Sequence, residues 1–126
     1  MAIHRNLWWM TPKGHTLDSG ALIVGLEAAL GRRAVVCGKP SPFVFRQAVA
    51  ELAAELAVRG ESRLRRRDVA MVGDDPKADI AAARRVGLRT ILVLTGKVDA
   101  AAAAAARVTP DAVAPSLPEV VSNLPT

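Results

Sequence analysis

The chain of 126 residues contains one cysteine, few aromatic residues and no long apolar run. A single cysteine, Cys37, excludes an internal disulfide and suits a reducing compartment, so we expect a cytoplasmic protein. Aromatic residues make up 3% of the chain, which predicts a mainly aliphatic core. No segment reaches the about 18 uninterrupted apolar residues that a membrane span needs. The first ten residues also lack the apolar centre of a signal peptide, so neither a membrane segment nor a signal peptide is expected.

The composition is that of one folded domain with an excess of positive charge. Hydrophobic residues make up 51% and charged residues 23%, which excludes an intrinsically disordered chain. The net charge of +5 raises the question of nucleic-acid binding. Much of the excess lies in the arginines Arg59, Arg63, Arg65, Arg66 and Arg67. Because no aromatic platform, helix-turn-helix or zinc-finger spacing accompanies them, we interpret them as a solvated helix end and loop rather than a nucleic-acid site.

Apolar runs and helix-like segments alternate through most of the chain. Residues 34–38, 69–73 and 90–94 are short apolar runs typical of buried parallel strands, and 41–56 and 77–87 carry helical patterns between them. This alternation predicts an α/β fold, a Rossmann-like parallel sheet with flanking helices.

The two ends of the chain add further elements. We expect a helix over 100–106, with a low-complexity linker as the alternative, and a short strand followed by a helix within 111–124. Residues 1–33 differ in pattern: a β-rich start with a turn at "TPKG" precedes a helix over 18–31. We therefore predict a boundary between a first unit, 1–33, and the sheet domain, 34–126.

Charged residues follow two of the predicted strands. The turn "CGKPSP" presents Lys39, and "GDDPKAD" presents Asp74, Asp75 and Asp79. Ligands of parallel α/β sheets bind at the carboxyl ends of the strands. A lysine suits phosphate, and a carboxylate pair suits Mg²⁺, so these residues predict a site for phosphoryl chemistry. The positive charges would also offset the repulsion among the three carboxylates.

A purely structural interpretation of the same residues stays open. Asp75 followed by Pro76 is a good helix start, and a carboxylate at Asp79 is favoured in a first helical turn without any metal. Lys39 could equally be a surface residue in a turn.

The segments "VVCGKPSPFVF" and "VAMVGDDPKADIAAARRVGLRTILVLTGK" resemble the third and fourth motifs of the haloacid dehalogenase superfamily. The chain is most similar to the branch with a large α/β cap, which includes phospholysine, phosphohistidine and inorganic pyrophosphate phosphatase-like members. The resemblance implies the C-terminal half of such a core, 34–126, preceded by the end of a cap, 1–33.

The resemblance also implies roles for the charged residues. Lys39 would stabilise the transferring phosphoryl group of a phosphorylated small molecule, and Asp79 would position Lys39. Asp74 would bind Mg²⁺ directly, and Asp75 would support the metal through water. Residues 18–22 would face the substrate from the cap.

The nucleophile motif of that superfamily, DxDxT, is missing, since no DxD occurs in the sequence. We therefore expect the chain to begin within the cap and to have negligible phosphatase activity alone. An exposed strand edge should result, to be covered by a homo-oligomer or by a complementing N-terminal half. The alternative is a non-catalytic α/β binding or oligomerisation module.

The residues that would choose the substrate are not identified by the sequence. Trp8, Trp9, His4 and His15 could line a substrate surface, although paired tryptophans are more often packing residues. The two histidines have no metal-ligand spacing with Cys37.

Overall fold

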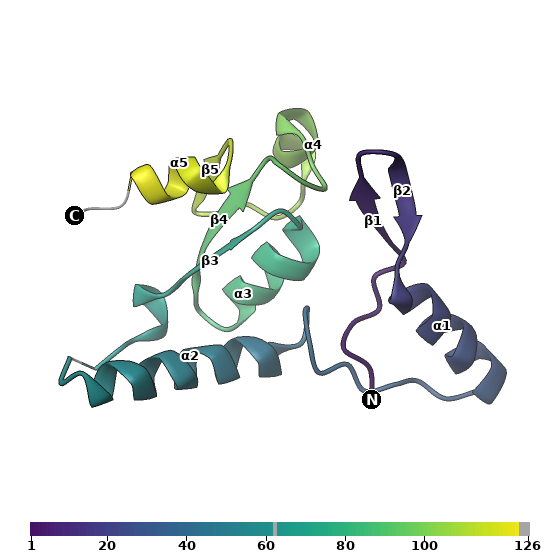
Figure 1. Cartoon of the computed structure of the whole chain (residues 1–126), viewed down its shortest axis with the longest axis horizontal. Coiled ribbons are helices and arrows are strands. Elements are labelled where there is room, and N and C mark those ends of the chain that lie inside the picture. The colour runs from purple at the N-terminus through teal and green to yellow at the C-terminus, as the bar shows by residue number, and fades with distance from the viewer. Residues whose placement is uncertain (62, 124–126) are drawn as a thin grey trace.

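The computed structural model describes residues 1–61 and 63–123, and its N-terminal part is a hairpin followed by a helix (Figure 1). Strands β1 (Trp8–Thr11) and β2 (Gly14–Leu17) pair antiparallel, with Trp8 opposite Leu17. Helix α1 (Ser19–Leu30) starts at Asp18, whose carboxylate accepts a hydrogen bond from the Ser19 backbone N–H. The β-rich start, its turn and the helix over 18–31 are thus confirmed.

The rest of the chain forms a three-stranded parallel sheet. Strands β3 (Ala70–Gly73), β4 (Arg89–Val93) and β5 (Ala112–Ala114) lie in the order β3-β4-β5. In register, Val72 lies opposite Ile91 and Leu92 opposite Val113. The parallel pairing with helices in the connections confirms the predicted α/β class.

The helices of the sheet domain begin at the capping residues that the sequence indicates. Ser41 caps α2, its hydroxyl accepting from the Phe43 N–H, and Asp99 caps α4 in the same way from Ala102. The bounds are α2 Pro42–Val58, 3₁₀ helix η1 Arg66–Asp68, π-helix η2 Pro76–Ala81, α3 Ala82–Arg85, α4 Ala100–Ala105 and α5 Leu117–Ser122. The predicted helix over 77–87 is present but begins with a π-helical turn. Of the predicted segment 111–124, Leu124 lies outside the described residues.

The core lies where α2 and α3 meet beside the sheet. Its buried members are Phe45, Ala82, Ala83, Val86 and Leu88, so it is aliphatic apart from one ring. The central strand β4 is the most buried of the three, whereas the edge strand β3 stays partly exposed. The apolar run 69–73, expected to form a buried strand, is therefore only partly buried.

The predicted strand over 34–38 is not a member of the sheet. Within the described residues it makes a single parallel bridge, between Val36 and Ala2. The backbone hydrogen bonds of this segment run to the N-terminal residues: the Cys37 N–H donates to Ala2 and the Gly38 N–H to Ile3. The apolar run is extended as predicted, but it pairs with the start of the chain instead of with β3.

The cluster of arginines lies on the surface, as expected for a solvated helix end and loop. Arg59 and the four arginines from 63 to 67 are all exposed. Arg59 pairs with Glu55 and Arg65 with Asp68, both local contacts. Across residues 1–61 and 63–123, no helix has the length and apolarity that crossing a bilayer requires.

Candidate functional site

The acidic turn, which we define as residues 74–79, follows directly from the carboxyl end of β3. Asp75 is the N-cap of η2, and its Oδ1 accepts from the backbone N–H groups of Lys77 and Ala78, each at 2.9 Å. Pro76 occupies the first helical position, where its missing N–H costs nothing. The structural role that the sequence allows for Asp75 is therefore real, and it engages one of the two carboxylate oxygens.

Asp79 is almost completely buried in this turn, with 2% of its surface exposed. Its Oδ2 accepts from the Asp75 N–H at 3.2 Å, and its Oδ1 lies 2.7 Å from the Nζ of Lys39. Oδ1 makes no well-angled hydrogen bond within the described residues, so charge holds this pair. A Cβ at Gly73 would collide with the Asp79 carboxylate, which explains the glycine at the end of β3.

The contact between Lys39 and Asp79 joins two turns that are far apart in the sequence. A buried carboxylate needs a countercharge, and Lys39 supplies it from the turn before α2. The Lys39 side chain remains half exposed at 48%, so its ammonium can also reach a ligand from solvent. The structure thus brings together Lys39, Asp75 and Asp79, as the sequence predicted.

Lys97 is a member of the site that the sequence-based interpretation missed. Its Nζ lies 2.6 Å from Asp75 Oδ2, and its backbone N–H donates to Asp74 Oδ2 at 3.0 Å. A signal was available, because Lys97 follows the strand 90–94 and the carboxyl ends of neighbouring parallel strands meet at one edge. A Cβ at Gly96 would collide with the Asp74 carboxylate, so this loop passes close to the acidic turn.

The contacts of Asp75 favour its ionised form. Burial alone would raise the pKa of Asp75, but the Lys97 ammonium and the N–H groups of Ala78 and Lys77 outweigh burial and lower it. Asp75 is therefore a carboxylate over the ordinary physiological range.

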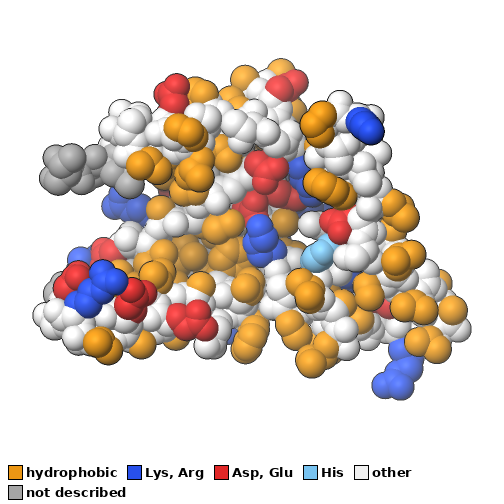
Figure 2. All heavy atoms as spheres, viewed as in Figure 1, with side chains coloured by type: hydrophobic (Ala, Val, Ile, Leu, Met, Phe, Trp, Pro, Cys, Tyr) orange, Lys and Arg blue, Asp and Glu red, His pale blue; other side chains and the backbone are white. Residues whose placement is uncertain are grey.

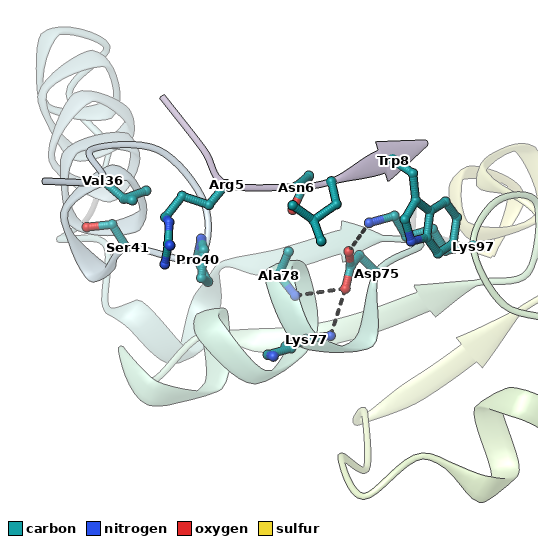
Figure 3. Close-up of a pocket in the computed structure, with 11 residues that line it drawn as sticks. Arg5, Asn6, Trp8, Val36, Pro40, Ser41, Asp75, Lys77, Ala78 and Lys97 are labelled. Atoms are coloured by element: carbon teal, nitrogen blue, oxygen red, sulfur yellow. Dashed lines mark hydrogen bonds and ion pairs between the residues drawn. The ribbon is translucent and has the colours of Figure 1, made fainter. Parts of the chain in front are cut away.

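A cavity of about 690 Å³ opens beside this turn, between the N-terminal segment and the sheet domain (Figure 3). Its lining residues are Arg5, Asn6, Leu7, Trp8, Val36, Pro40, Ser41, Asp75, Lys77, Ala78 and Lys97. In the close-up, Lys97 lies between Asp75 and the ring of Trp8. Of the four residues predicted for the site, only Asp75 lines the cavity, while Lys39 immediately precedes the lining residues Pro40 and Ser41.

The cavity is electropositive in its lining side chains. The lining contains three basic side chains, Arg5, Lys77 and Lys97, and one carboxylate, Asp75. Arg5 is paired with Glu27 at 2.6 Å and Lys97 with Asp75, while Lys77 has no ion pair among the described residues. Figure 2 shows acidic and basic side chains gathered where the hairpin part meets the sheet part. Such a lining suits an anion of the size of a phosphate ester.

The two carboxylates at the end of β3, Asp74 and Asp75, could hold a partly hydrated metal ion but do not form a site with three protein ligands in the part of the chain that the structure describes. Within the described residues no group of three or more histidine, cysteine, aspartate or glutamate side chains could hold a metal. Mg²⁺, however, usually keeps several waters and uses one or two protein carboxylates with a substrate phosphate. Asp74 suits this donor set, because only its Oδ2 takes part in a hydrogen bond in the described structure. Asp75 has both oxygens engaged, which suits a contact through water better than direct ligation.

The remaining candidates from the sequence have different positions. Residues 18–22, expected to face the substrate, do not line the cavity, and Asp18 instead caps α1. Trp8 lines the cavity and packs against His15, with ring centroids 4.2 Å apart. Trp9 is largely exposed and does not line it.

Among protein-family models, the HAD-hydrolase-like model matches residues 36–120. Among curated proteins, the chain is 33% identical to the phospholysine phosphohistidine inorganic pyrophosphate phosphatase of Bos taurus, covering 76% of this chain and 32% of that protein. It is 34% identical to chronophin of Rattus norvegicus, covering 76% of this chain and 28% of that one. The chain thus spans about a third of the length of these curated relatives.

Solved structures of phosphatases superpose on the chain as well. The 4-nitrophenylphosphatase of Thermotoga maritima matches with a TM-score of 0.76 and 28% identity, over 97% of this chain and 43% of that chain. A glycerol phosphate phosphatase of Mycobacterium tuberculosis, solved in complex with magnesium, matches with a TM-score of 0.68 and 29% identity, over 88% and 31% of the two chains. The fold and the sequence therefore point to the same group of proteins.

Proposed function

Because this chain belongs to the HAD-hydrolase-like family, we propose that it supplies the phosphate-binding and Mg²⁺-binding residues of a phosphatase. The reaction would be Mg²⁺-dependent hydrolysis of a phosphate monoester or of pyrophosphate, with a phosphorylated small molecule as substrate. Residues 34–126 would form the C-terminal part of the catalytic domain, and residues 1–33 the end of a cap. The observation that carries the proposal is the 2.7 Å contact between Lys39 and buried Asp79 beside the acidic turn.

Each residue of the site has a role that its contacts support. Asp79, which accepts a hydrogen bond from the Asp75 N–H, would hold the Lys39 ammonium beside the acidic turn. Lys39 then places a positive charge where a phosphoryl oxygen would enter from solvent. Lys39 and Asp79 are thus the proposed catalytic and positioning pair, with Lys39 also binding substrate.

Asp74 would hold Mg²⁺ directly through its unengaged Oδ1, and Asp75 would reach the ion through water. Bound there, the ion would supply positive charge against the phosphoryl oxygens. The glycerol phosphate phosphatase relative, whose structure contains magnesium, supports this assignment by likeness.

The sequence contains no DxD motif, so the 126-residue polypeptide lacks the carboxylate that would attack phosphorus. Lys39 and the metal-binding carboxylates cannot act as that nucleophile. A complementing N-terminal half would have to supply it, whereas a homo-oligomer of this chain would only cover the exposed strand edge. The absent nucleophile and the basic cavity together favour a second candidate, a non-catalytic α/β module that binds anions or oligomerises.

The proposal is tested by calorimetric titration of the purified chain with inorganic phosphate, with and without Mg²⁺. Lys39→Met should weaken phosphate binding about tenfold, because a charge-assisted hydrogen bond is lost. Lys13→Met is the control, an exposed lysine in the turn between β1 and β2 that does not line the cavity, and it should change the affinity less than about twofold. Equal affinity in wild type and Lys39→Met would overturn the assignment of Lys39.

Two further measurements, the effect of Mg²⁺ on phosphate binding and an assay of phosphatase activity, separate the candidate functions. In a phosphatase-derived site, Mg²⁺ strengthens phosphate binding and Asp74→Asn removes that effect, whereas phosphate binding to the second candidate is indifferent to Mg²⁺. Neither the wild-type chain nor Asp74→Asn should hydrolyse 4-nitrophenyl phosphate. Mg²⁺-dependent turnover by the wild type above the Asp74→Asn control would refute the inference that the nucleophile is lacking.

A further inference from the structure

We infer that Lys97 is an internal competitor of Mg²⁺ at the acidic turn: its ammonium holds Asp75 until a divalent cation displaces it. This inference rests on the proposed function, in which Asp74 and Asp75 bind the metal. It adds a residue whose charge sets how tightly the metal binds.

Lys97 contacts the carboxylates of both Asp74 and Asp75. Its Nζ lies 2.6 Å from Asp75 Oδ2, and its backbone N–H donates to Asp74 Oδ2 at 3.0 Å. The ion pair is well shielded, with 22% of the Lys97 and 16% of the Asp75 side chain exposed. A shielded pair is screened less by salt and water than a surface pair, so it is a real barrier to an incoming ion.

Lys97 occupies the Asp75 oxygen that a metal-bound water would use. Asp75 Oδ1 is used by the N–H groups of Lys77 and Ala78, which cap η2. Oδ2 is therefore the oxygen left for a metal or for a metal-bound water, and the Lys97 ammonium takes it. A divalent ion beside Asp74 and the ammonium on Asp75 would also repel each other at short range.

The ammonium already lies near the Trp8 ring while it pairs with Asp75, so the ring can hold it when Mg²⁺ takes Asp75. Its Nζ lies 5.3 Å from the centre of the Trp8 ring, within the range of a cation–π contact. Figure 3 shows Lys97 between Asp75 and Trp8, at the wall of the cavity. Since Lys97 and Trp8 both line a cavity of about 690 Å³, the side chain has room to swing toward the ring.

The other lysines near the turn do not share this arrangement. Lys39 pairs with Asp79, which no Mg²⁺ contact requires. Lys77 lines the same cavity but is exposed and has no ion pair among the described residues. It therefore serves as a control that removes the same charge from the same rim without removing the contact to Asp75.

The test measures the affinity of the full chain for Mg²⁺ alone by calorimetry, at constant ionic strength, for the wild type and five variants. Lys97→Met should bind Mg²⁺ about tenfold more tightly than the wild type, because the competitor and its repulsion are gone. Lys97→Gln should show the same direction and serves if Lys97→Met does not fold. Lys97→Arg, which keeps the charge, and Lys77→Met should each stay within about twofold of the wild type. Asp74→Asn should lose Mg²⁺ binding.

A spectroscopic reading tests the movement of the side chain. In a Trp9→Phe background, Trp8 is the remaining tryptophan, so Mg²⁺ should change its fluorescence in the presence of Lys97 and leave it unchanged in Lys97→Met. If Lys97→Met and Lys77→Met bind Mg²⁺ equally while Asp74→Asn loses it, the competition is refuted and the proposed function stands. If Asp74→Asn binds Mg²⁺ like the wild type, the metal assignment itself fails.

Discussion

Lys39 and Asp79 form an ion pair, but replacing Lys39 should destabilise the protein more than replacing Asp79. Asp79 is 2% exposed, whereas 48% of the Lys39 side chain reaches solvent. Lys39→Met leaves a buried carboxylate without its countercharge, and breaking a buried pair in this way costs about 3–5 kcal/mol. Because Lys39 is itself half exposed, water already weakens the pair, and we expect a loss of about 2–3 kcal/mol. Asp79→Asn leaves only a lysine that water can solvate, and the amide oxygen can still accept from Asp75, so about 1 kcal/mol is expected.

The difference is measured by urea unfolding of wild type, Lys39→Met, Asp79→Asn and the double variant. For a chain of this length, 2–3 kcal/mol corresponds to a fall in Tm of about 10 °C. Lys77→Met, an exposed lysine on the acidic turn, controls for the loss of a positive charge and should change stability by less than about 0.5 kcal/mol. The double variant should be more stable than Lys39→Met, because the uncompensated charge is gone. An Asp79→Asn variant less stable than Lys39→Met would refute this reasoning.

Two further properties of the chain are open to direct measurement. The Thr90 hydroxyl and backbone N–H donate to Asp111 and lower its pKa, so this carboxylate stabilises the fold above its unfolded-state pKa and stops doing so as pH falls through the lower folded-state value. Asp111→Asn should therefore flatten the acid side of a Tm–pH curve, and unchanged acid sensitivity would contradict the assignment. Second, the accessible surface of 8956 Å² exceeds the about 6,500 Å² expected for a compact monomer of this mass, so the chain alone should self-associate. A monodisperse species of 13.3 kDa by light scattering at micromolar concentration would count against that expectation.

Local chemistry made much of the fold and part of the site predictable from the sequence. Ser41, Asp75 and Asp99 are capping residues whose side chains bond backbone N–H groups within three positions, so each fixes a helix start without any distant contact. Apolar runs joined by helices predicted parallel strands, and the carboxyl ends of parallel strands lie at one edge of the sheet. That argument located the acidic turn, whereas Lys39 reaches the turn from segment 34–38, which is not a strand of the sheet.

Contacts between distant segments could not be read from the sequence in the same way. The apolar run 34–38 is extended, but whether it pairs with β3 or with the chain start depends on tertiary packing, and Ala2 is its partner. The place of Lys97 after the strand 90–94 indicates that it lies near the acidic turn, but its pairing with Asp75 and its position beside Trp8 depend on tertiary packing. The π-helical turn at 76–81 likewise has no pattern that distinguishes it from an α-helix.

The exposed edge of β3 links the excess surface to the chemistry of the site. Within the described residues β3 pairs only with β4, so its other edge presents unpaired backbone groups to solvent. A further strand in parallel on that edge would lie about 4.8 Å away and would end on the same side of the sheet as Gly73. A carboxylate just beyond such a strand would lie beside Asp74, next to the turn that holds Lys39 and Lys97. One added strand would then both cover the free edge of β3 and bring the nucleophile. We therefore expect that a polypeptide which pairs with β3 and reduces self-association also confers phosphatase turnover.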